Sequence, residues 1–255
     1  IEIPFYNQAV KGSIKVNKYG ENIIYKDNSY YYDKVKLEDV YFEVYAKEDI
    51  YDNDVLVYNK DDLVGKIITN KDGFGSLNNL PLGAYYMIEV KSSNNNIVND
   101  KKYNINLEYK DQYTEVINYK TTLENHLPKG TLEFTKSDYS NSKTLPNTLI
   151  EIYNENDELV YSGRTDENGK IIIDKLPVGK YYILEKEAPE GYKINEEKMY
   201  FEITEDGQVV KCNMLDEAYE VPNTGLSSIN YELIGSLVLI VSGLGLFLYG
   251  TKKRK

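Results

Sequence analysis

The sequence contains an internal repeat, and this feature limits its fold more than any other. Short segments recur in the same order: Gly12–Lys18 as Gly130–Lys136, Phe42–Tyr45 as Ile150–Tyr153, Thr69–Gly73 as Thr165–Gly169, and Leu80–Glu89 as Leu176–Glu185. The separation between equivalent segments is 118, then 108, then 96 residues, so the first copy carries two insertions of about ten and twelve residues. Ordered self-similarity of this kind indicates one structural unit folded twice.

Both copies have the pattern of β-strands. Apolar and polar residues alternate, and Asp-Gly at 72–73 and Asn-Gly at 168–169 are hairpin turn signals. No long helical pattern interrupts the repeats. We therefore expect an all-β chain with two sandwiches, at 10–125 and 128–216, while residues 1–9 have the alternation of a last strand from a preceding repeat.

Charge excludes two classes of partner. The net charge is −11, but residues after Thr224 carry +3, so residues 1–224 carry −14. Such an acidic body repels nucleic acid and anionic lipid, and binding to either is not expected.

Metal, cofactor and disulfide chemistry have little support. The sequence has one cysteine, Cys212, and one histidine, His126, so it lacks a disulfide pair and a zinc ligand set, and we expect no cofactor. The carboxylates of Asp49, Asp52 and Asp54 could hold calcium, but solvated loop charges are the simpler interpretation.

Strand alternation places a lysine and a glutamate of each copy on the face that points into the core. Lys18 shares a face with Ile14 and Val16, Lys136 with Leu132 and Phe134, Glu89 with Tyr85 and Met87, and Glu185 with Tyr181 and Ile183. An unpaired buried charge costs several kcal/mol, so these groups must be paired or neutralised.

With these residues the repeats resemble the collagen-adhesin B-type (Cna B-type, SpaA-like) domains of Gram-positive adhesins and pilins. The shared marks are a Gly-x-apolar-x-apolar-x-Lys first strand, a glutamate strand and an asparagine on the last strand. Glu185–Tyr192 resembles the family's glutamate box, whereas the first copy lacks the Ala-Pro-x-Gly-Tyr tail after Glu89. The resemblance implies tandem prealbumin-like, inverse-immunoglobulin sandwiches.

In this family the lysine and asparagine side chains join as an intramolecular isopeptide bond. The resemblance implies crosslinks from Lys18 to Asn118 and from Lys136 to Asn213, with Glu89 and Glu185 as the catalytic carboxyls. An apolar core suits this chemistry, because burial lowers a lysine pKa and raises a glutamate pKa. Two buried Lys–Glu ion pairs with asparagine as a hydrogen-bond partner remain the alternative.

The C-terminal region, residues 217–255, resembles a sortase sorting signal. Val221, Pro222, Asn223, Thr224 and Gly225 match the Leu-Pro-x-Thr-Gly pentapeptide except for valine at the first position. An uncharged segment at 233–249, expected to be a transmembrane helix, and a basic tail at 252–255 follow. The resemblance implies that sortase cleaves after Thr224 and joins its carbonyl to peptidoglycan. A plain single-pass anchor is the alternative.

These features together predict an extracellular protein fixed to the cell wall of a Gram-positive bacterium. The main hypothesis is a mechanically stable stalk of an adhesin whose upstream domains contact a host ligand; the alternative is a pilin joined to other pilin subunits. A module of a secreted enzyme or carbohydrate-binding protein is a third hypothesis, with Tyr30–Tyr32 as a stacking platform, although strand packing is the simpler role for that run. No turnover of an external substrate is expected.

Overall fold

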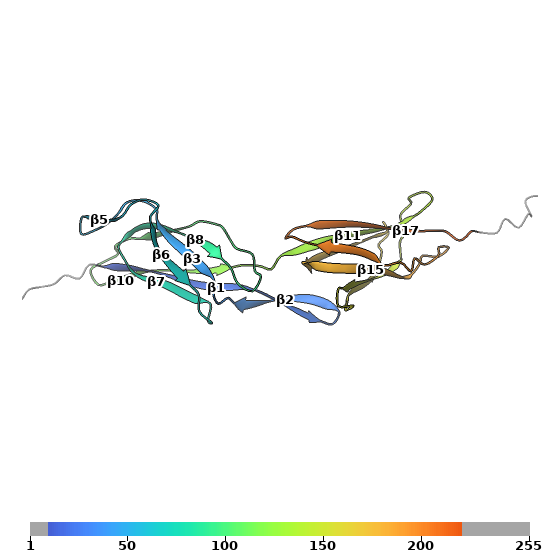
Figure 1. Cartoon of the computed structure of the whole chain (residues 1–255), viewed down its shortest axis with the longest axis horizontal. Helices are drawn as coiled ribbons and strands as arrows, with labels where there is room; N and C mark the ends of the chain where they lie inside the picture. Colours follow the sequence, from blue (N-terminus) through green and yellow to red (C-terminus); the bar gives the residue numbers. More distant parts are fainter. Residues whose placement is uncertain (1–9, 221–255) are drawn as a thin grey trace, which may run out of the picture. The chain divides into compact units, whose positions relative to one another are not determined.

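A computed structural model describes residues 10–220, and this part of the chain is built from β-strands (Figure 1). The prediction of all-β sandwiches is confirmed. No helix able to cross a membrane occurs between residues 10 and 220. The expected strand at 1–9 and the expected transmembrane helix at 233–249 lie outside the described residues.

The first sandwich contains ten strands: β1 (Lys11–Lys26), β2 (Ser29–Lys36), β3 (Tyr41–Ala46), β4 (Ile50–Asp52), β5 (Val55–Tyr58), β6 (Leu63–Ile68), β7 (Phe74–Leu80), β8 (Gly83–Lys91), β9 (Tyr103–Leu107) and β10 (Val116–Glu124). One sheet has the order β10-β1-β2, with β7 also paired to β1, and the other has the order β6-β3-β8-β9. Strands β4 and β5 form a separate two-stranded hairpin.

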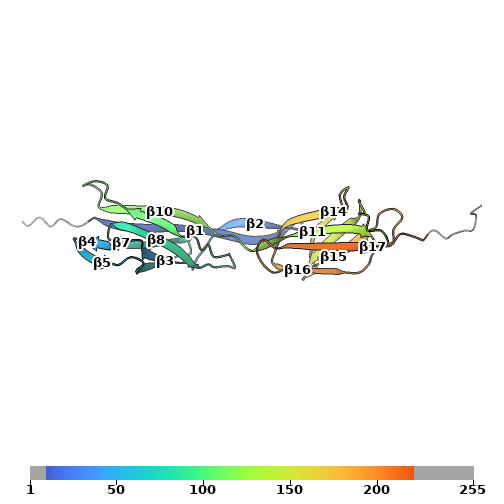
Figure 2. The same ribbon diagram turned by 90° about the horizontal axis from the view of Figure 1, so that it is seen from above.

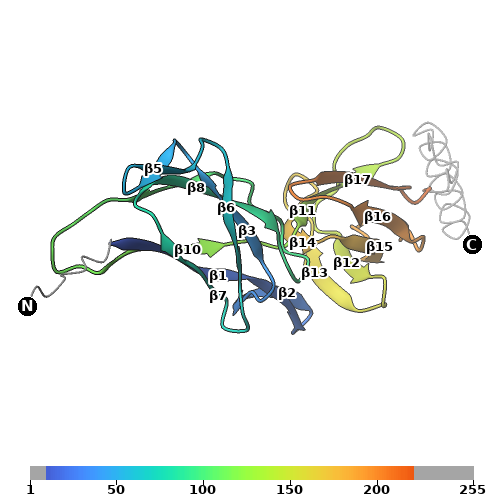
Figure 3. The ribbon, with the colours of Figure 1, turned by 60° about the vertical axis from the view of Figure 1, so that its left-hand side comes forward.

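The second sandwich contains seven strands: β11 (Lys129–Asp138), β12 (Leu149–Asn154), β13 (Leu159–Arg164), β14 (Lys170–Pro177), β15 (Gly179–Glu187), β16 (Met199–Ile203) and β17 (Val209–Asp216). Its sheets have the orders β14-β11-β17 and β13-β12-β15-β16. Figure 3 shows β15 between β12 and β16.

In each sandwich the first and last strands pair in parallel. β1 pairs with β10 from Lys11 opposite Val116 to Tyr19 opposite Glu124, and β11 pairs with β17 in the same way (Figure 2). All other strand pairs of the described part are antiparallel. The parallel pair therefore brings the end of the first strand beside the end of the last, although the two are distant in sequence.

Each sandwich has its own apolar core. Burial alternates along the strands as the sequence pattern predicts, and along β11 the inward positions include Leu132, Phe134 and Lys136. The same alternation along β1 buries Ile14, Val16 and Lys18. A lysine thus ends the inward row of apolar side chains in both copies.

The two insertions of the first copy form hairpins. One extends β1 and adds β2, and the other supplies β4 and β5. Tyr25 and Tyr30 of the first hairpin pack against the core cluster of the second sandwich, and the Tyr32 hydroxyl donates to the Lys175 carbonyl at 2.7 Å. Two residues of the Tyr30–Tyr32 run therefore serve in packing and hydrogen bonding.

A glycine turn supports the backbone of each inward lysine. Gly169 has a φ of +69°, and its carbonyl accepts a hydrogen bond from the Lys136 backbone N–H at 2.8 Å. A Cβ at this position would lie 2.8 Å from the Leu145 nitrogen and 2.9 Å from the Lys136 carbonyl oxygen. Gly73 has the same position relative to Lys18. These turns require glycine both for φ and for space.

We expect Gly169→Ala to lower stability by at least about 2 kcal/mol, because left-handed strain adds to a contact with rigid backbone. Gly207→Ala is the matched control, since Gly207 has a φ of +74° but nothing within 4 Å of a built Cβ. Its expected cost is about 1 kcal/mol, from strain alone. Denaturant unfolding of the two variants measures the difference. Equal losses would show that the close backbone approach at Gly169 is unimportant.

Candidate functional site

The first site is built around Lys18, which is fully buried in β1. Its Nζ lies 2.6 Å from Oε2 of Glu89, a residue of β8 whose side chain is also fully buried. The Phe42 ring centroid is 5.6 Å from the same nitrogen. The structure thus brings together the lysine and the glutamate that the sequence placed on inward faces.

The third member of the first site is Asn125, the residue directly after β10. Lys18 Nζ donates to Asn125 Oδ1 at 2.5 Å, and Asn125 Nδ2 donates to Glu89 Oε1. Nδ2 also donates to the Ser92 hydroxyl oxygen at 2.9 Å. The Asn125 backbone N–H donates to the Tyr19 carbonyl, which continues the β1–β10 pairing by one step. An amine, an amide and a carboxyl therefore meet in a closed apolar core.

Burial controls the charge state of this lysine. Desolvation lowers the pKa of Lys18, although the hydrogen bond and the charge of Glu89 oppose the shift. A lowered pKa reduces the free energy needed to convert the ammonium to the neutral amine, which is the nucleophilic form. The amine lies beside an amide carbonyl, so the arrangement can perform an acyl transfer within the chain.

The second site repeats this geometry with a different acyl group. Lys136 Nζ lies 3.1 Å from Glu185 Oε2, and it also donates to Oδ1 of Asp216, the last residue of β17. All three side chains are fully buried. The Asn195 backbone N–H donates to Glu185 Oε2 at 2.9 Å. Here an amine meets two carboxyl groups.

Two carboxylates and one ammonium cannot all stay charged in this core without leaving a net buried charge. Burial raises the pKa of Glu185, and the nearby Asp216 raises it further, against the opposing effects of the Asn195 N–H and Lys136. Glu185 Oε1 and Asp216 Oδ2 are buried without a hydrogen-bond partner in the described part of the chain. A proton held on Glu185 leaves one positive and one negative charge, which can pair.

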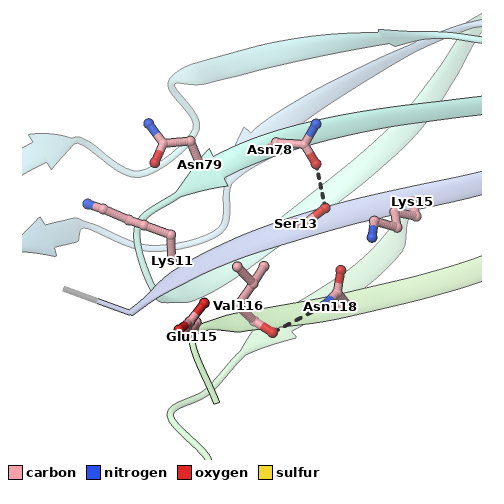
Figure 4. A pocket seen from close by; sticks show the side chains of 8 residues that line it. All are labelled: Lys11, Ser13, Lys15, Asn78, Asn79, Glu115, Val116 and Asn118. Carbon is pink, nitrogen blue, oxygen red and sulfur yellow. Dashed lines mark hydrogen bonds between the residues drawn. The ribbon is translucent and has the colours of Figure 1, made fainter. Parts of the chain in front are cut away.

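The prediction that Asn118 partners Lys18 is wrong. Asn118 is exposed and lies opposite Ser13, and its Nδ2 donates to the Val116 carbonyl at 3.1 Å. Figure 4 shows it in an open pocket with Ser13 and Val116. Ser13 precedes Lys18 by five residues on β1, so Asn118 lies about 16 Å along the strands from Lys18. The parallel register instead sets Lys18 opposite Leu123, so Asn125 is the residue that reaches it.

The prediction that Asn213 partners Lys136 is also wrong. Asn213 lies opposite Thr135, whose side chain points away from the core, and it accepts a hydrogen bond from the Ser137 hydroxyl at 3.1 Å. Lys211 shares this outer face and pairs there with Glu133 at 3.2 Å. Met214 is opposite Lys136, and Asp216 follows two residues later on the same face.

A sequence signal for the true partners exists at the ends of the last strands. Leu123-x-Asn125 and Met214-x-Asp216 both have a buried apolar residue followed two positions later by a buried amide or acid.

The sortase residues at 221–225 lie outside the described residues. Asp52 of the suggested calcium loop is paired with Lys11 at 2.5 Å, and Asp49 accepts from the Lys60 backbone N–H.

Comparison with known proteins identifies the family. The model of the SpaA prealbumin-like fold domain matches residues 12–122 and again residues 130–218. The chain belongs to the SpaA prealbumin-like family. None of the curated proteins matches the sequence.

Three solved structures illustrate what the chain is similar to. The TIE protein of Bacillus anthracis is 31% identical over 82% of this chain, with a TM-score of 0.55, and the chain spans 34% of that protein. GBS52, the minor pilin of Streptococcus agalactiae, is 17% identical over 83% of this chain and 98% of its own, with a TM-score of 0.36. The shaft pilin SpaA of Lactobacillus rhamnosus GG is 13% identical over 83% of this chain and 99% of its own, with a TM-score of 0.35.

We expect Asn125→Ala to destabilise the first SpaA-type domain by at least about 2 kcal/mol, because it removes a partner of two buried groups, Lys18 and Glu89. Asn118→Ala removes an exposed side chain and should change stability by less than about 0.5 kcal/mol. Thermal unfolding of both variants measures the contrast. The reverse order of effects would restore Asn118 as the functional residue.

Proposed function

We propose that each sandwich closes an intramolecular isopeptide bond, from Lys18 to Asn125 in the first domain and from Lys136 to Asp216 in the second. The observation that carries the proposal is the 2.5 Å approach of Lys18 Nζ to the Asn125 side chain, with Glu89 in contact with both. The same three positions recur in the second domain with Lys136, Glu185 and Asp216.

In the first domain the reaction releases ammonia. Lys18 passes a proton to Glu89, and the neutral amine then forms a bond from Nζ to Cγ of Asn125. The Cγ–Nδ2 bond breaks as the proton held by Glu89 goes to the departing nitrogen, which leaves as ammonia, and Glu89 takes up the second proton that Nζ loses as the new amide forms. Folding supplies the proximity, which makes an otherwise very slow amide exchange feasible once in each molecule.

In the second domain the reaction releases water, because the acyl group belongs to Asp216 and Glu185 already holds a proton. Lys136 passes one proton to the Asp216 carboxylate, and the neutral Nζ bonds to Cγ of Asp216. The Cγ–O bond breaks as Glu185 protonates the departing oxygen, which leaves as water, and Glu185 takes up the second proton that Nζ loses. Glu185 serves as the proton carrier, and its raised pKa suits that role because the group must hold a proton near neutral pH.

The bonds would restrict unfolding of both domains. They join residues 107 positions apart in the first domain and 80 apart in the second. By analogy with disulfides, closing loops of this size stabilises the folded state by about 4 to 5 kcal/mol. A pulling force would also pass directly between the first and last strands, so the sheets would not need to bear it.

These properties suit a mechanically stable stalk. The match of the SpaA prealbumin-like domain to both halves of the chain supports a protein of this kind. The pentapeptide Val221–Gly225 supports sortase as the partner and Thr224 as the residue joined to peptidoglycan outside the cell. The second candidate is a pilin subunit, which the SpaA-type fold supports equally.

Intact-mass measurement of the recombinant chain should show the loss of one ammonia and one water. Tryptic digestion should yield two branched peptides, one joining Lys18 to Asn125 and one joining Lys136 to Asp216. Glu89→Ala should restore the ammonia alone and Glu185→Ala the water alone, because each carboxyl serves its own domain. A folded wild-type chain with its full calculated mass would contradict the proposal.

Anchoring has a separate test in Gram-positive cells that export the chain behind a secretion signal and that carry a sortase. Muralytic digestion should release protein that ends at Thr224 joined to peptidoglycan fragments, and Thr224→Ala should abolish this product. A ladder of covalent polymers would instead identify a pilin subunit. Full-length protein recovered from the membrane, still carrying Lys255, would exclude sortase processing.

A further inference from the structure

The two sites differ in one contact on the group that must leave. In the first domain Asn125 Nδ2 has two acceptors, Glu89 Oε1 and the Ser92 hydroxyl, the latter at 2.9 Å. Ser92 is half-buried and directly follows β8, three residues after Glu89. The equivalent position after β15, three residues beyond Glu185, is Ala188, which has no polar side-chain atom.

This difference follows the chemistry of the acyl group. The amide of Asn125 has two N–H hydrogens, and a second acceptor satisfies both of them. The carboxylate of Asp216 has no hydrogen to donate, so a hydroxyl beside it has no such task. The serine is present where nitrogen leaves and absent where oxygen leaves.

From these observations we infer that Ser92 is a positioning residue of the first site, which holds the amide of Asn125 with its nitrogen toward the proton carrier and its carbonyl toward Lys18. The inference rests on the proposed isopeptide reaction. The flipped amide would direct Nδ2 at the Lys18 amine, donor against donor, and would turn the leaving group away from Glu89.

The need for Ser92 arises during the reaction. In the ground state a Glu89 carboxylate accepts from Nδ2 and by itself favours this orientation. Once Glu89 has taken the proton from Lys18, it becomes a donor as well and no longer distinguishes nitrogen from oxygen. The Ser92 hydroxyl can also donate, so it does not select the orientation by its chemistry alone. Its contact with Nδ2 is already formed before the proton moves and must break for the amide to turn, so it keeps the nitrogen where Glu89 can protonate it.

The test is the rate of bond formation in the newly made full chain. Cell-free synthesis is pulsed, samples are quenched in acid, and the branched peptides at Asn125 and Asp216 are quantified over time. Ser92→Ala should slow ammonia loss at Asn125 roughly three- to tenfold, the effect of one positioning hydrogen bond. The rate of water loss at Asp216 in the same molecules is the internal reference and should not change.

Two control variants separate positioning from packing. Ser93→Ala removes the neighbouring hydroxyl, which is buried without a partner in the described residues, and should leave the rate unchanged. Ser92→Thr keeps a hydroxyl at the position and should restore most of the rate.

The decisive arm changes the leaving group. In an Asn125→Asp background the first domain should lose water, and adding Ser92→Ala should then have no effect on the rate. A structural role for Ser92 would slow both backgrounds equally, and that result would overturn the inference. An unchanged rate of ammonia loss in Ser92→Ala would overturn it as well.

The results also distinguish failure of this inference from failure of the proposed isopeptide reaction on which it rests. Absence of any bond at Asn125 in the wild-type chain would remove the isopeptide reaction and the role of Ser92 together. Normal ammonia loss in both the wild type and Ser92→Ala would leave the reaction intact and remove only the role of Ser92.

Discussion

The burial of a lysine at the inner end of the first strand is the constraint on which the rest of each domain depends. A charged amine in an apolar core must have partners, and these come from a middle strand of the opposite sheet and from the end of the last strand. A slip of one residue in the first strand would turn Lys18 to the outer face. The lysine therefore fixes the register of three strands at once.

The two domains meet this constraint with different supporting contacts. In the first, Asn96 bonds to both backbone groups of Glu21 and ties down the segment after β8. In the second, the Tyr192 hydroxyl donates to Asp138, and this contact helps hold the pKa of that carboxyl down at about 2, after the larger effect of the Ser140 hydroxyl. Tyr192 belongs to the Ala-Pro-x-Gly-Tyr tail that the first copy lacks. The first site therefore brings its lysine, glutamate and asparagine together without that tail.

Local pattern in the sequence was sufficient for the strands, the two copies, and the inward lysines and glutamates. Alternation depends only on neighbouring residues, so the faces of Lys18, Lys136, Glu89 and Glu185 could be predicted. The acyl partners depend on the register between strands some 80 to 107 residues apart, and the local signal at the ends of the last strands does not supply that register. Asn118 and Asn213 follow Glu89 and Glu185 at the similar intervals of 29 and 28 residues, but this spacing does not determine which residue of the last strand lies opposite the lysine. The packing of Tyr25 and Tyr30 against the core of the second sandwich could not be predicted from the repeat, because their hairpin is an insertion that the second copy lacks.

Parallel pairing of the first and last strands also determines where the chain enters and leaves each domain. β1 begins at Lys11 beside the start of β10, and β10 ends at Glu124 beside Tyr19, so entry and exit are at opposite ends (Figure 1). The same holds for β11 and β17. A domain with this connectivity can be duplicated in a gene without a long linker that runs back along the domain, because the chain leaves each copy at the end opposite to its entry. The number of copies can then change by recombination between repeats, while every copy keeps its own complete core.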